Sequence, residues 1–339
     1  MLPLVEFIRL EAMSQQPPPV SNPYGPVPGG FPERNVLSGP PPGWKPGDPL
    51  FGERPPAQFH AGPPSGWGQR PPRKRQQDSE PGRFTWWDLG ATLFYVLGFL
   101  TGLVSFLALL PPVNALMAGD EIQQQQGMFT INAISYGVLA AITMSVSAAA
   151  LWRSVRAFAY LWWLKLLLVP FAWLATLLLN FVLIVVVLGA DPETSENQEA
   201  IDTMLQAVPF LAAVAVIAVL GPFVEEYFFR HLLIGKLSRY INVWICGAVS
   251  IIAFPLLHFI PALFGLADDL TLVSLVPYLT MGVLISVGYI VTGRNLFYAW
   301  VLHFFNNFMS LLVSYFVLPW AEDFGQPYQS LYWLANLIG

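Results

Sequence analysis

Seven long apolar segments, separated by short polar connections, constrain this chain more than any other feature of its sequence. They cover roughly residues 86–110, 129–151, 160–189, 207–234, 243–264, 271–292 and 295–318. About 20 apolar residues span the hydrocarbon core of a membrane as a helix, which satisfies its own backbone hydrogen bonds there. The chain is 55% hydrophobic and 11% charged, whereas soluble domains carry about 25% charged residues. We therefore predict an all-α fold, a polytopic membrane helix bundle with about seven transmembrane helices.

The connections between these segments alternate in charge. Every second connection carries Lys or Arg, as at Arg153, Lys236 and Arg294, and the intervening ones, such as 191–202 and 268–269, are acidic without Lys or Arg. Basic loops are enriched on the cytoplasmic side of a membrane. This pattern predicts a multi-pass protein of the cell (plasma) membrane, with its N-terminus in the cytoplasm and its C-terminus outside.

The first 83 residues have a different composition, because they hold 20 of the 31 prolines. Such a segment buries too little apolar surface to offset its ordering entropy, and its prolines favour extended conformations. We predict a disordered Pro/Gly-rich cytoplasmic tail over 1–83 and a transmembrane domain over 84–339. The proline runs at 17–19 and 40–42 could bind a partner protein, and a purely solubilising tail is the alternative.

Two adjacent acidic residues, Glu225 and Glu226, interrupt the fourth apolar segment. An ionised side chain in the hydrocarbon core costs at least ~2.5 kcal/mol, so an intramembrane carboxylate is a functional-site hypothesis. Arg230 follows Glu226 by four residues, which is the favourable order for an ion pair on one helix face. Glu225 points about 100° away from Glu226 around the helix. We expect Arg230 to neutralise one carboxylate and leave the other free for chemistry.

Two histidines of the C-terminal half are candidates for the same site. His258 shares a helix face with Phe254, and His303 shares one with Asn307. Residues at equal distances from the turn of an antiparallel helix pair lie at equal depth, and Glu225 and His258 are equally far from the turn between the fourth and fifth segments. We expect Glu225, His258, His303 and Asn307 to line one buried polar cavity that opens toward the cytoplasmic side.

These residue types suit the hydrolysis of a peptide bond. A glutamate beside a histidine can activate water, and a second histidine with an amide can donate hydrogen bonds to an oxyanion. Glu225, His258 and His303 would also make a Zn²⁺ ligand set, although the sequence has no His-Glu-x-x-His helix. We favour no cofactor, with zinc as the alternative. Taken singly, each residue could equally be a structural ion-pair or hydrogen-bond partner between helices.

Three short motifs in the C-terminal half resemble those of a known family. In chain order they are Glu225-Glu226-x-x-x-Arg230, Phe254-x-x-x-His258 and His303-x-x-x-Asn307. They resemble the CPBP family of intramembrane glutamic endopeptidases, which includes the type II CAAX prenyl endopeptidases and bacterial relatives linked to bacteriocin processing or self-immunity. The resemblance covers about residues 200–318, the expected protease core. His231 is a departure, because family members usually have glycine at that position.

The resemblance implies a CAAX endopeptidase-like hydrolase that cleaves a membrane-associated or lipid-anchored polypeptide. Glu225 and His258 would activate water, and His303 with Asn307 would form an oxyanion hole. The supporting residues would be Glu226, Arg230 and Phe254. The expected partners are the lipid bilayer and a polypeptide substrate, with no nucleic acid.

Two other functions remain open from the sequence. One is a non-proteolytic membrane adaptor or bacteriocin self-immunity protein. The other is a proton-coupled transporter, in which Glu225 and His258 would relay protons. No internal repeat is evident in the sequence, which counts against transporters built on inverted repeats.

Overall fold

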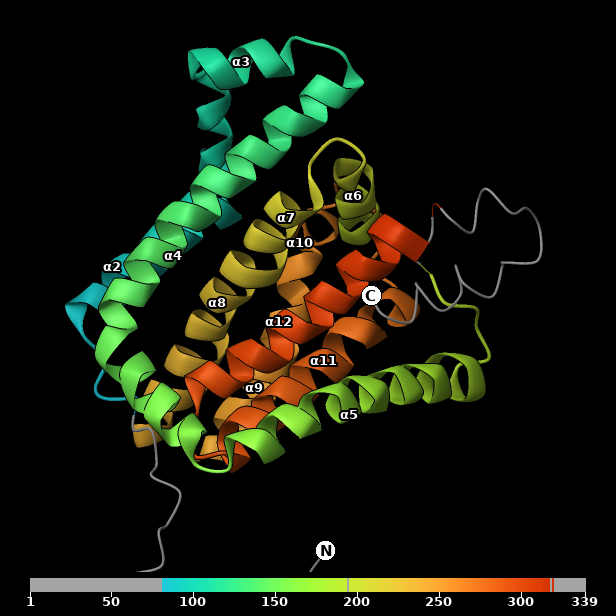
Figure 1. Ribbon diagram of the computed structural model, residues 1–339. Coiled ribbons are helices and arrows are strands. Elements are labelled where there is room, and N and C mark those ends of the chain that lie inside the picture. The colour runs from blue at the N-terminus through green and yellow to red at the C-terminus, as the bar shows by residue number, and fades with distance from the viewer. Residues whose placement is uncertain (1–80, 194, 318, 320–339) are drawn as a thin grey trace, which may run out of the picture. The chain divides into compact units, whose positions relative to one another are not determined.

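The computed structural model describes residues 81–193, 195–317 and 319, and these residues form helices and connecting turns without a strand (Figure 1). The all-α prediction is therefore confirmed for this part of the chain. The predicted tail, residues 1–83, falls almost entirely outside the described residues.

The described helices follow one another closely along the chain, and η marks segments of π or 3-10 geometry. They are α2 (Trp86–Tyr95), η1 (Val96–Leu100), η2 (Leu103–Leu109), α3 (Pro111–Met117), α4 (Glu121–Ala159), α5 (Trp162–Phe181), η3 (Val182–Val187), α6 (Glu196–Leu205), α7 (Phe210–Ala213), η4 (Val214–Leu220), α8 (Gly221–Glu226), η5 (Tyr227–Lys236), η6 (Leu237–Arg239), α9 (Val243–His258), α10 (Ile260–Leu263), α11 (Leu272–Val291), α12 (Leu296–Leu312) and η7 (Val313–Val317).

Five of the described helices are long and apolar enough to cross a membrane. They are Glu121–Ala159, Trp162–Val187, Phe210–Arg239, Leu272–Val291 and Leu296–Val317. The first predicted span is a helix pair, Trp86–Phe99 and Leu103–Leu109, bent by 63°, and would be a sixth if the pair counts as one span. The fifth predicted span contains α9, which has only 16 residues. The predicted count of seven is therefore approximate, and length and composition give five or six.

Two local features explain why the first and fifth predicted spans are not single long helices. The first bends at Gly102, which has a φ of 75°, a conformation that glycine adopts without a steric penalty. The fifth breaks at Phe259, where φ is −111°. Pro261 follows two residues later and has no N–H to donate to the carbonyl of Leu257, four residues earlier.

The basic turns meet at one end of the bundle and the acidic connections at the other. At the basic end, Asn295 Nδ2 donates to the Ser154 carbonyl at 3.0 Å, and Arg294 Nη1 donates to Ser238 Oγ at 3.4 Å. At the acidic end, the Glu196 backbone N–H donates to Asp269 Oδ2 at 3.0 Å. The alternation of charge along the sequence thus separates into two ends of one helical unit.

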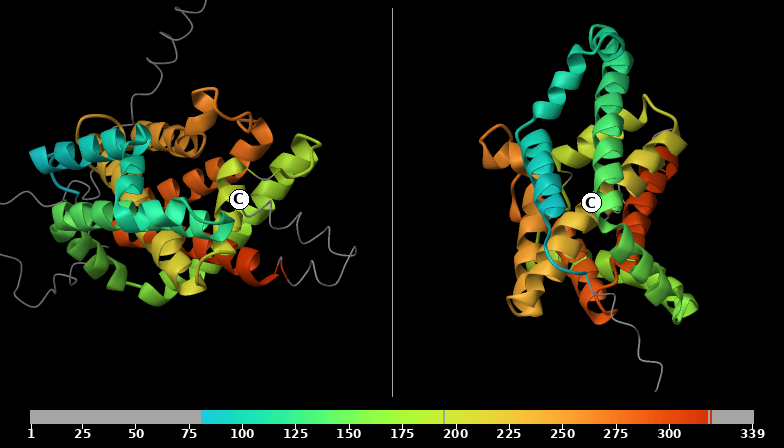
Figure 2. Two further views of the ribbon diagram at one scale, coloured as in Figure 1. Left: turned by 90° about the horizontal axis from the view of Figure 1, so that it is seen from above. Right: turned by 90° about the vertical axis from the view of Figure 1, so that its left-hand side faces the viewer.

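Helix α4 packs through a face of small residues. The bent first pair and α3 lie against it, and its length runs past the helices of the C-terminal half (Figures 1 and 2). Small residues allow helix backbones to approach closely inside a membrane. The buried positions of α4 are Gly127, Ser135, Leu139, Ala140, Thr143, Ser147, Ala150, Ser154 and Ala157.

The turn between α4 and α5 is closed by a buried lysine. Lys165 is 6% exposed, and its Nζ donates to the carbonyls of Ala157, Phe158 and Tyr160 at 2.7, 3.2 and 2.7 Å. The last carbonyls of a helix have no partner within it, and a lysine can supply one. These contacts join the start of α5 to the last turn of α4.

Candidate active site

Glu226, the last residue of α8, is fully enclosed by two cationic or hydrogen-bonding partners. Its Oε1 lies 3.1 Å from Arg230 Nη1 and 2.8 Å from His303 Nδ1. Glu226 and Arg230 are both 0% exposed, and a buried charge is tolerated when it is paired. The predicted ion pair between Glu226 and Arg230 is confirmed.

Arg230 is held by groups of two other helices. Its guanidinium carbon lies 4.4 Å from the centre of the Phe254 ring of α9, and its Nη2 donates to the Gly282 carbonyl of α11 at 3.5 Å. A cation over an aromatic face is stabilised electrostatically when water is excluded. The same Phe254 ring packs edge-on to His303, with ring centres 5.6 Å apart. Phe254 therefore packs against the cation and the imidazole that contact Glu226.

Glu225 points in a different direction from its neighbour, into a cavity. It is 7% exposed, and its Oε2 lies 3.7 Å from His303 Nε2. The imidazole of His303 therefore stands between the two glutamates, with Nδ1 on Glu226 and Nε2 facing Glu225. One carboxylate is sealed in an ion pair, and the other faces open volume.

The cavity has a volume of about 630 Å³, and all four residues expected to be catalytic line it. Glu225 comes from α8, His258 from the end of α9, and His303 and Asn307 from one face of α12. Neither Glu226 nor Arg230 belongs to its lining. The structure thus brings the four predicted residues to one cavity, and their catalytic roles stay a prediction.

His258 reaches the cavity from the end of α9, with partners of its own. It is the last residue of α9, its Nδ1 donates to the Phe254 carbonyl at 3.3 Å, and its ring lies 4.4 Å from the ring of Tyr278. The histidine in contact with Glu225 is His303. The sequence-based pairing of Glu225 with His258 therefore places both at the cavity, while the direct contact belongs to His303.

Asn307 is fixed by a backbone carbonyl that a proline leaves without a helical donor. In the π segment η4 each N–H bonds the carbonyl five residues earlier, as Gly221 N does to Val216 O. The next donor would be residue 222, which is Pro222 and has no N–H. Asn307 Nδ2 donates instead to the Ile217 carbonyl at 3.1 Å. One amide hydrogen and the amide oxygen remain for the cavity.

Comparison with known proteins places a family match over these helices. Residues 207–309 match the family model described as "Type II CAAX prenyl endopeptidase Rce1-like". The predicted family resemblance is confirmed. This Rce1-like segment, 207–309, contains all three motifs, from Glu225 to Asn307.

A curated relative is similar over a shorter stretch. The "Putative membrane peptidase YdiL" of Bacillus subtilis (strain 168) is 36% identical over 64 residues, which are 19% of this chain and 25% of that protein. The chain thus matches about a quarter of the length of that relative. No solved structure matches the chain. Together with the long apolar helices, the Rce1-like segment identifies a multi-pass membrane protein.

The cavity extends from Glu225 toward the acidic end of the bundle. Its lining there includes Glu196, Asn197 and Asp269, and it includes none of the residues in the basic turns 236–243 and 293–295. The expected opening toward the basic end, assigned to the cytoplasm, is therefore wrong for this geometry. The physical reason is a buried polar network that fills the basic end.

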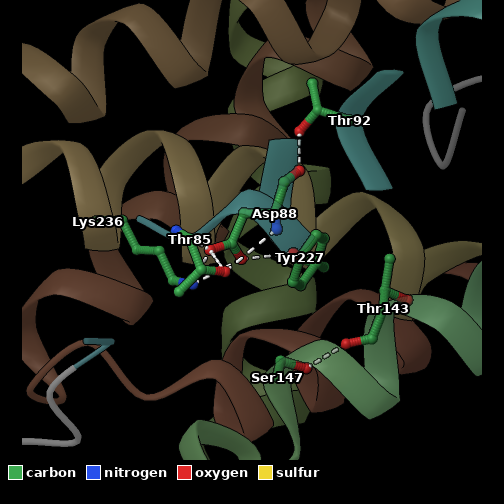
Figure 3. A network of polar contacts seen from close by, with 7 residues as sticks. All are labelled: Thr85, Asp88, Thr92, Thr143, Ser147, Tyr227 and Lys236. Carbon is green, nitrogen blue, oxygen red and sulfur yellow. Dashed lines mark hydrogen bonds and ion pairs between the residues drawn. The ribbon is translucent and has the colours of Figure 1, made fainter. Parts of the chain in front are cut away.

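That network joins the first helix to the Rce1-like segment (Figure 3). Asp88 of α2 is 0% exposed, and its carboxylate accepts from Lys236 Nζ at 2.6 and 2.7 Å and from Tyr227 OH at 2.7 Å. Thr85 Oγ1 donates to the same carboxylate at 2.7 Å. Because Tyr227 directly follows Glu226, Asp88 ties the first helix to the helix that carries the glutamates.

Sequence reasoning missed Asp88, since it lies in the first turn of an apolar segment, where an acidic residue is expected from the helix dipole alone. A signal was present. Thr85 and Asp88 form a capping box, in which each side chain bonds the backbone N–H of the other. That motif locates the helix start but not the partners from a distant helix.

His231, the departure from the family pattern, lies in the buried region behind the site. It is 2% exposed and its ring stacks on Tyr227 at 5.6 Å. It does not line the cavity. The substitution of histidine for glycine therefore changes the packing around Tyr227 rather than the cavity wall.

The zinc alternative finds no support in the side-chain geometry. Within 81–193 and 195–317, no group of three His, Cys, Asp or Glu side chains is arranged to hold a metal ion, and this includes the candidate set Glu225, His258 and His303. The side chains present at the cavity therefore do not fit zinc.

Proposed function

We propose that this chain is an intramembrane protease, a CAAX endopeptidase-like hydrolase that cleaves a membrane-associated or lipid-anchored polypeptide. The observation that carries the proposal is the division between the glutamates. Glu226 is sealed by Arg230 and His303, while Glu225 faces a cavity of about 630 Å³ with two histidines and an asparagine. The Rce1-like match and the relative named as a membrane peptidase support it. Neither points to a transporter or an adaptor.

Glu225 is the proposed general base. In this mechanism a water beside Glu225 gives its proton to the carboxylate, and the resulting hydroxide adds to the carbonyl carbon of the substrate. His258 bonds Phe254 through Nδ1, so its Nε2 is the ring nitrogen left to orient that water. Glu225 then returns the proton to the leaving nitrogen as the C–N bond breaks.

His303 and Asn307 are the proposed oxyanion donors. In its imidazolium form His303 would donate Nδ1–H to Glu226 and Nε2–H toward a carbonyl oxygen bound near Glu225, since Nε2 is 3.7 Å from Oε2. Asn307 would add its second amide hydrogen. Donors that are fixed before the reaction stabilise a developing negative charge without reorganisation, and Glu226 with Arg230 supplies that fixation for His303.

The charge pattern supports a plasma-membrane protein with a cytoplasmic N-terminus. Under that orientation the basic end faces the cytoplasm, and the cavity extends toward the outer side. We also propose that the proline runs at 17–19 and 40–42 bind a partner protein. Thiol labelling of single cysteines introduced at Asp120 and Arg239, in intact cells and in opened membranes, tests the orientation.

Comparison of wild type with Glu225→Gln tests the activity. Membrane proteomics of cells that express either form should reveal a polypeptide that is processed only by wild type, and the purified full-length proteins should reproduce the difference on a quenched peptide spanning that site. Glu199→Gln is the matched control, because Glu199 is exposed and lies outside the cavity lining. Equal cleavage of the peptide by wild type and Glu225→Gln would contradict the proposed function.

A further inference from the structure

Tyr278 of α11 connects the candidate active site to the acidic segment that walls the cavity. It is 6% exposed, lines the cavity, and belongs to none of the three motifs. Its hydroxyl shares a hydrogen bond with Ser195 Oγ at 2.8 Å and accepts one from Asn197 Nδ2 at 3.2 Å. These two contacts span 83 and 81 residues of sequence.

The other face of the same side chain supports His258. The two rings lie 4.4 Å apart at an interplanar angle of 32°, and Phe259 packs edge-on to Tyr278 at 5.5 Å. His258 is the last helical residue of α9, and its Nδ1 contact with Phe254 is 3.3 Å long. One long hydrogen bond does not fix the ring plane of an imidazole, and the contact with the tilted Tyr278 ring supplies the second constraint.

The segment that holds the Tyr278 hydroxyl is itself anchored and faces the cavity. Ser195 caps α6 by accepting from the Gln198 N–H at 3.2 Å, and the Glu196 N–H donates to Asp269 at 3.0 Å. Along α6, Asn197, Gln198, Ile201 and Met204 line the cavity. A polypeptide in the cavity would contact α6 on one side and His258 on the other.

We propose that Tyr278 is a positioning residue for His258 and that hydrogen bonds with Ser195 and Asn197 hold Tyr278 in place. In the same proposal, α6 forms the cavity wall whose contacts with the polypeptide set substrate preference. The proposal rests on the proposed peptidase function. It adds a residue and a helix outside the motif set, since α6 precedes the Rce1-like segment that begins at residue 207. In this proposal Ser195 and Asn197 hold the Tyr278 hydroxyl, and the Tyr278 ring in turn holds the His258 imidazole.

A chemical probe of His258 tests the link without a substrate. Diethyl pyrocarbonate modifies accessible imidazoles, and peptide mapping of the full-length protein separates His258 from His303. Tyr278→Phe keeps the ring and loses the hydroxyl contacts, and should raise the modification rate at His258 roughly threefold to tenfold, as expected for one or two lost hydrogen bonds. The double substitution Ser195→Ala/Asn197→Ala should give the same increase. Adding Tyr278→Phe to it should give no further increase, because the residues act as one unit.

Tyr298→Phe is the matched control, because Tyr298 is 5% exposed in α12 and lies outside the cavity lining. It should leave the His258 rate at the wild-type value. Thermal unfolding of each variant in the same detergent identifies any that fail to fold. Asn197→Ala alone, which removes only the 3.2 Å contact, serves as the second, milder variant and should give a smaller rise in the His258 rate. An unchanged His258 rate in folded Tyr278→Phe, or the same rise in Tyr298→Phe, would overturn the proposal.

Kinetics on the peptide identified with Glu225→Gln separate this inference from the proposed function. Tyr278→Phe should lower kcat with little change in KM, whereas Gln198→Ala and Ile201→Ala in α6 should change KM and the ranking of peptide sequences. If wild type cleaves and Glu225→Gln does not, but Tyr278→Phe matches wild type in kcat, only the inference fails. If wild type and Glu225→Gln act equally, the proposed function fails while the His258 labelling result still stands.

Discussion

Nδ1 of His303 lies 2.8 Å from Oε1 of Glu226, and this contact organises the whole candidate site. It joins α12 to α8, it turns the opposite ring nitrogen toward Glu225, and it shares its acceptor atom with Arg230. Two adjacent carboxylates in an apolar helix are therefore made unequal by a single imidazole. The unequal pair is what allows one glutamate to be structural and the other to face the cavity.

Loss of Arg230 should destabilise the fold strongly. Arg230→Met leaves Glu226 buried without its cation, and removing one partner of a buried ion pair costs about 3–5 kcal/mol. Unfolding of the purified protein in mixed detergent micelles measures the difference. Arg239→Met is the control, because Arg239 is exposed at the basic end. Equal unfolding midpoints for Arg230→Met and wild type would contradict the interpretation of Glu226 as a charge that depends on this pair.

The structural and chemical roles of Asn307 can be separated through Pro222. Asn307→Leu should lose both activity and about 1–3 kcal/mol of stability, since the Ile217 carbonyl is left without a donor. Pro222→Ala restores a backbone N–H at the position that π geometry pairs with Ile217. The double variant should recover stability but not peptide cleavage. Recovery of cleavage in the double variant would show that Asn307 has only a structural role.

The charged and polar motif residues were predictable from sequence because each one is costly in a membrane and helical spacing fixes its face. Glu226 and Arg230 are four residues apart on one helix, so their pairing follows from local geometry alone. The shared cavity of Glu225, His258, His303 and Asn307 required only that short turns keep neighbouring helices in register. These inferences depend on helix period and depth, which a sequence shows directly.

The direction of the cavity and the partner of Glu225 were not predictable in this way. The cavity extends to the acidic end, where residues of α6 line it, and Asp88 with Lys236 fills the basic end. Both facts depend on contacts between residues far apart in the sequence, such as Asp88 and Lys236, which are 148 positions apart. Helix rotation, which decides whether His258 or His303 touches Glu225, also leaves no trace in residue spacing.

The Asp88 network should hold α2 against the helix that carries Glu225 and Glu226. Asp88→Asn keeps the hydrogen-bonding shape but leaves Lys236 buried without a counter-charge, because Lys236 is 5% exposed. We expect a loss of about 3–5 kcal/mol, as for other buried pairs broken on one side. Combining it with Lys236→Met should recover part of that loss. An additive or larger loss in the double variant, measured by the same unfolding assay, would contradict a direct ion pair.

Asp202 of α6 should make the acidic end sensitive to pH. Burial raises the pKa of Asp202 above its ordinary value of 3.8, in spite of hydrogen bonds from Ser314 and Gln198 that lower it, the latter at 2.8 Å. A carboxyl whose pKa is higher in the folded state binds its proton more tightly there, which stabilises the fold at low pH. This contribution to stability is complete below the ordinary pKa of 3.8 and is lost as the pH rises through the higher pKa of the folded state. Asp202→Asn removes this titration, and the variant should gain stability relative to wild type as the pH rises from acid toward neutral. Thermal unfolding at a series of pH values checks the sign, with Glu121→Gln as the control, because Glu121 is exposed in the first turn of α4. A stability difference between Asp202→Asn and wild type that is constant across the series would show that the Asp202 proton is not linked to folding.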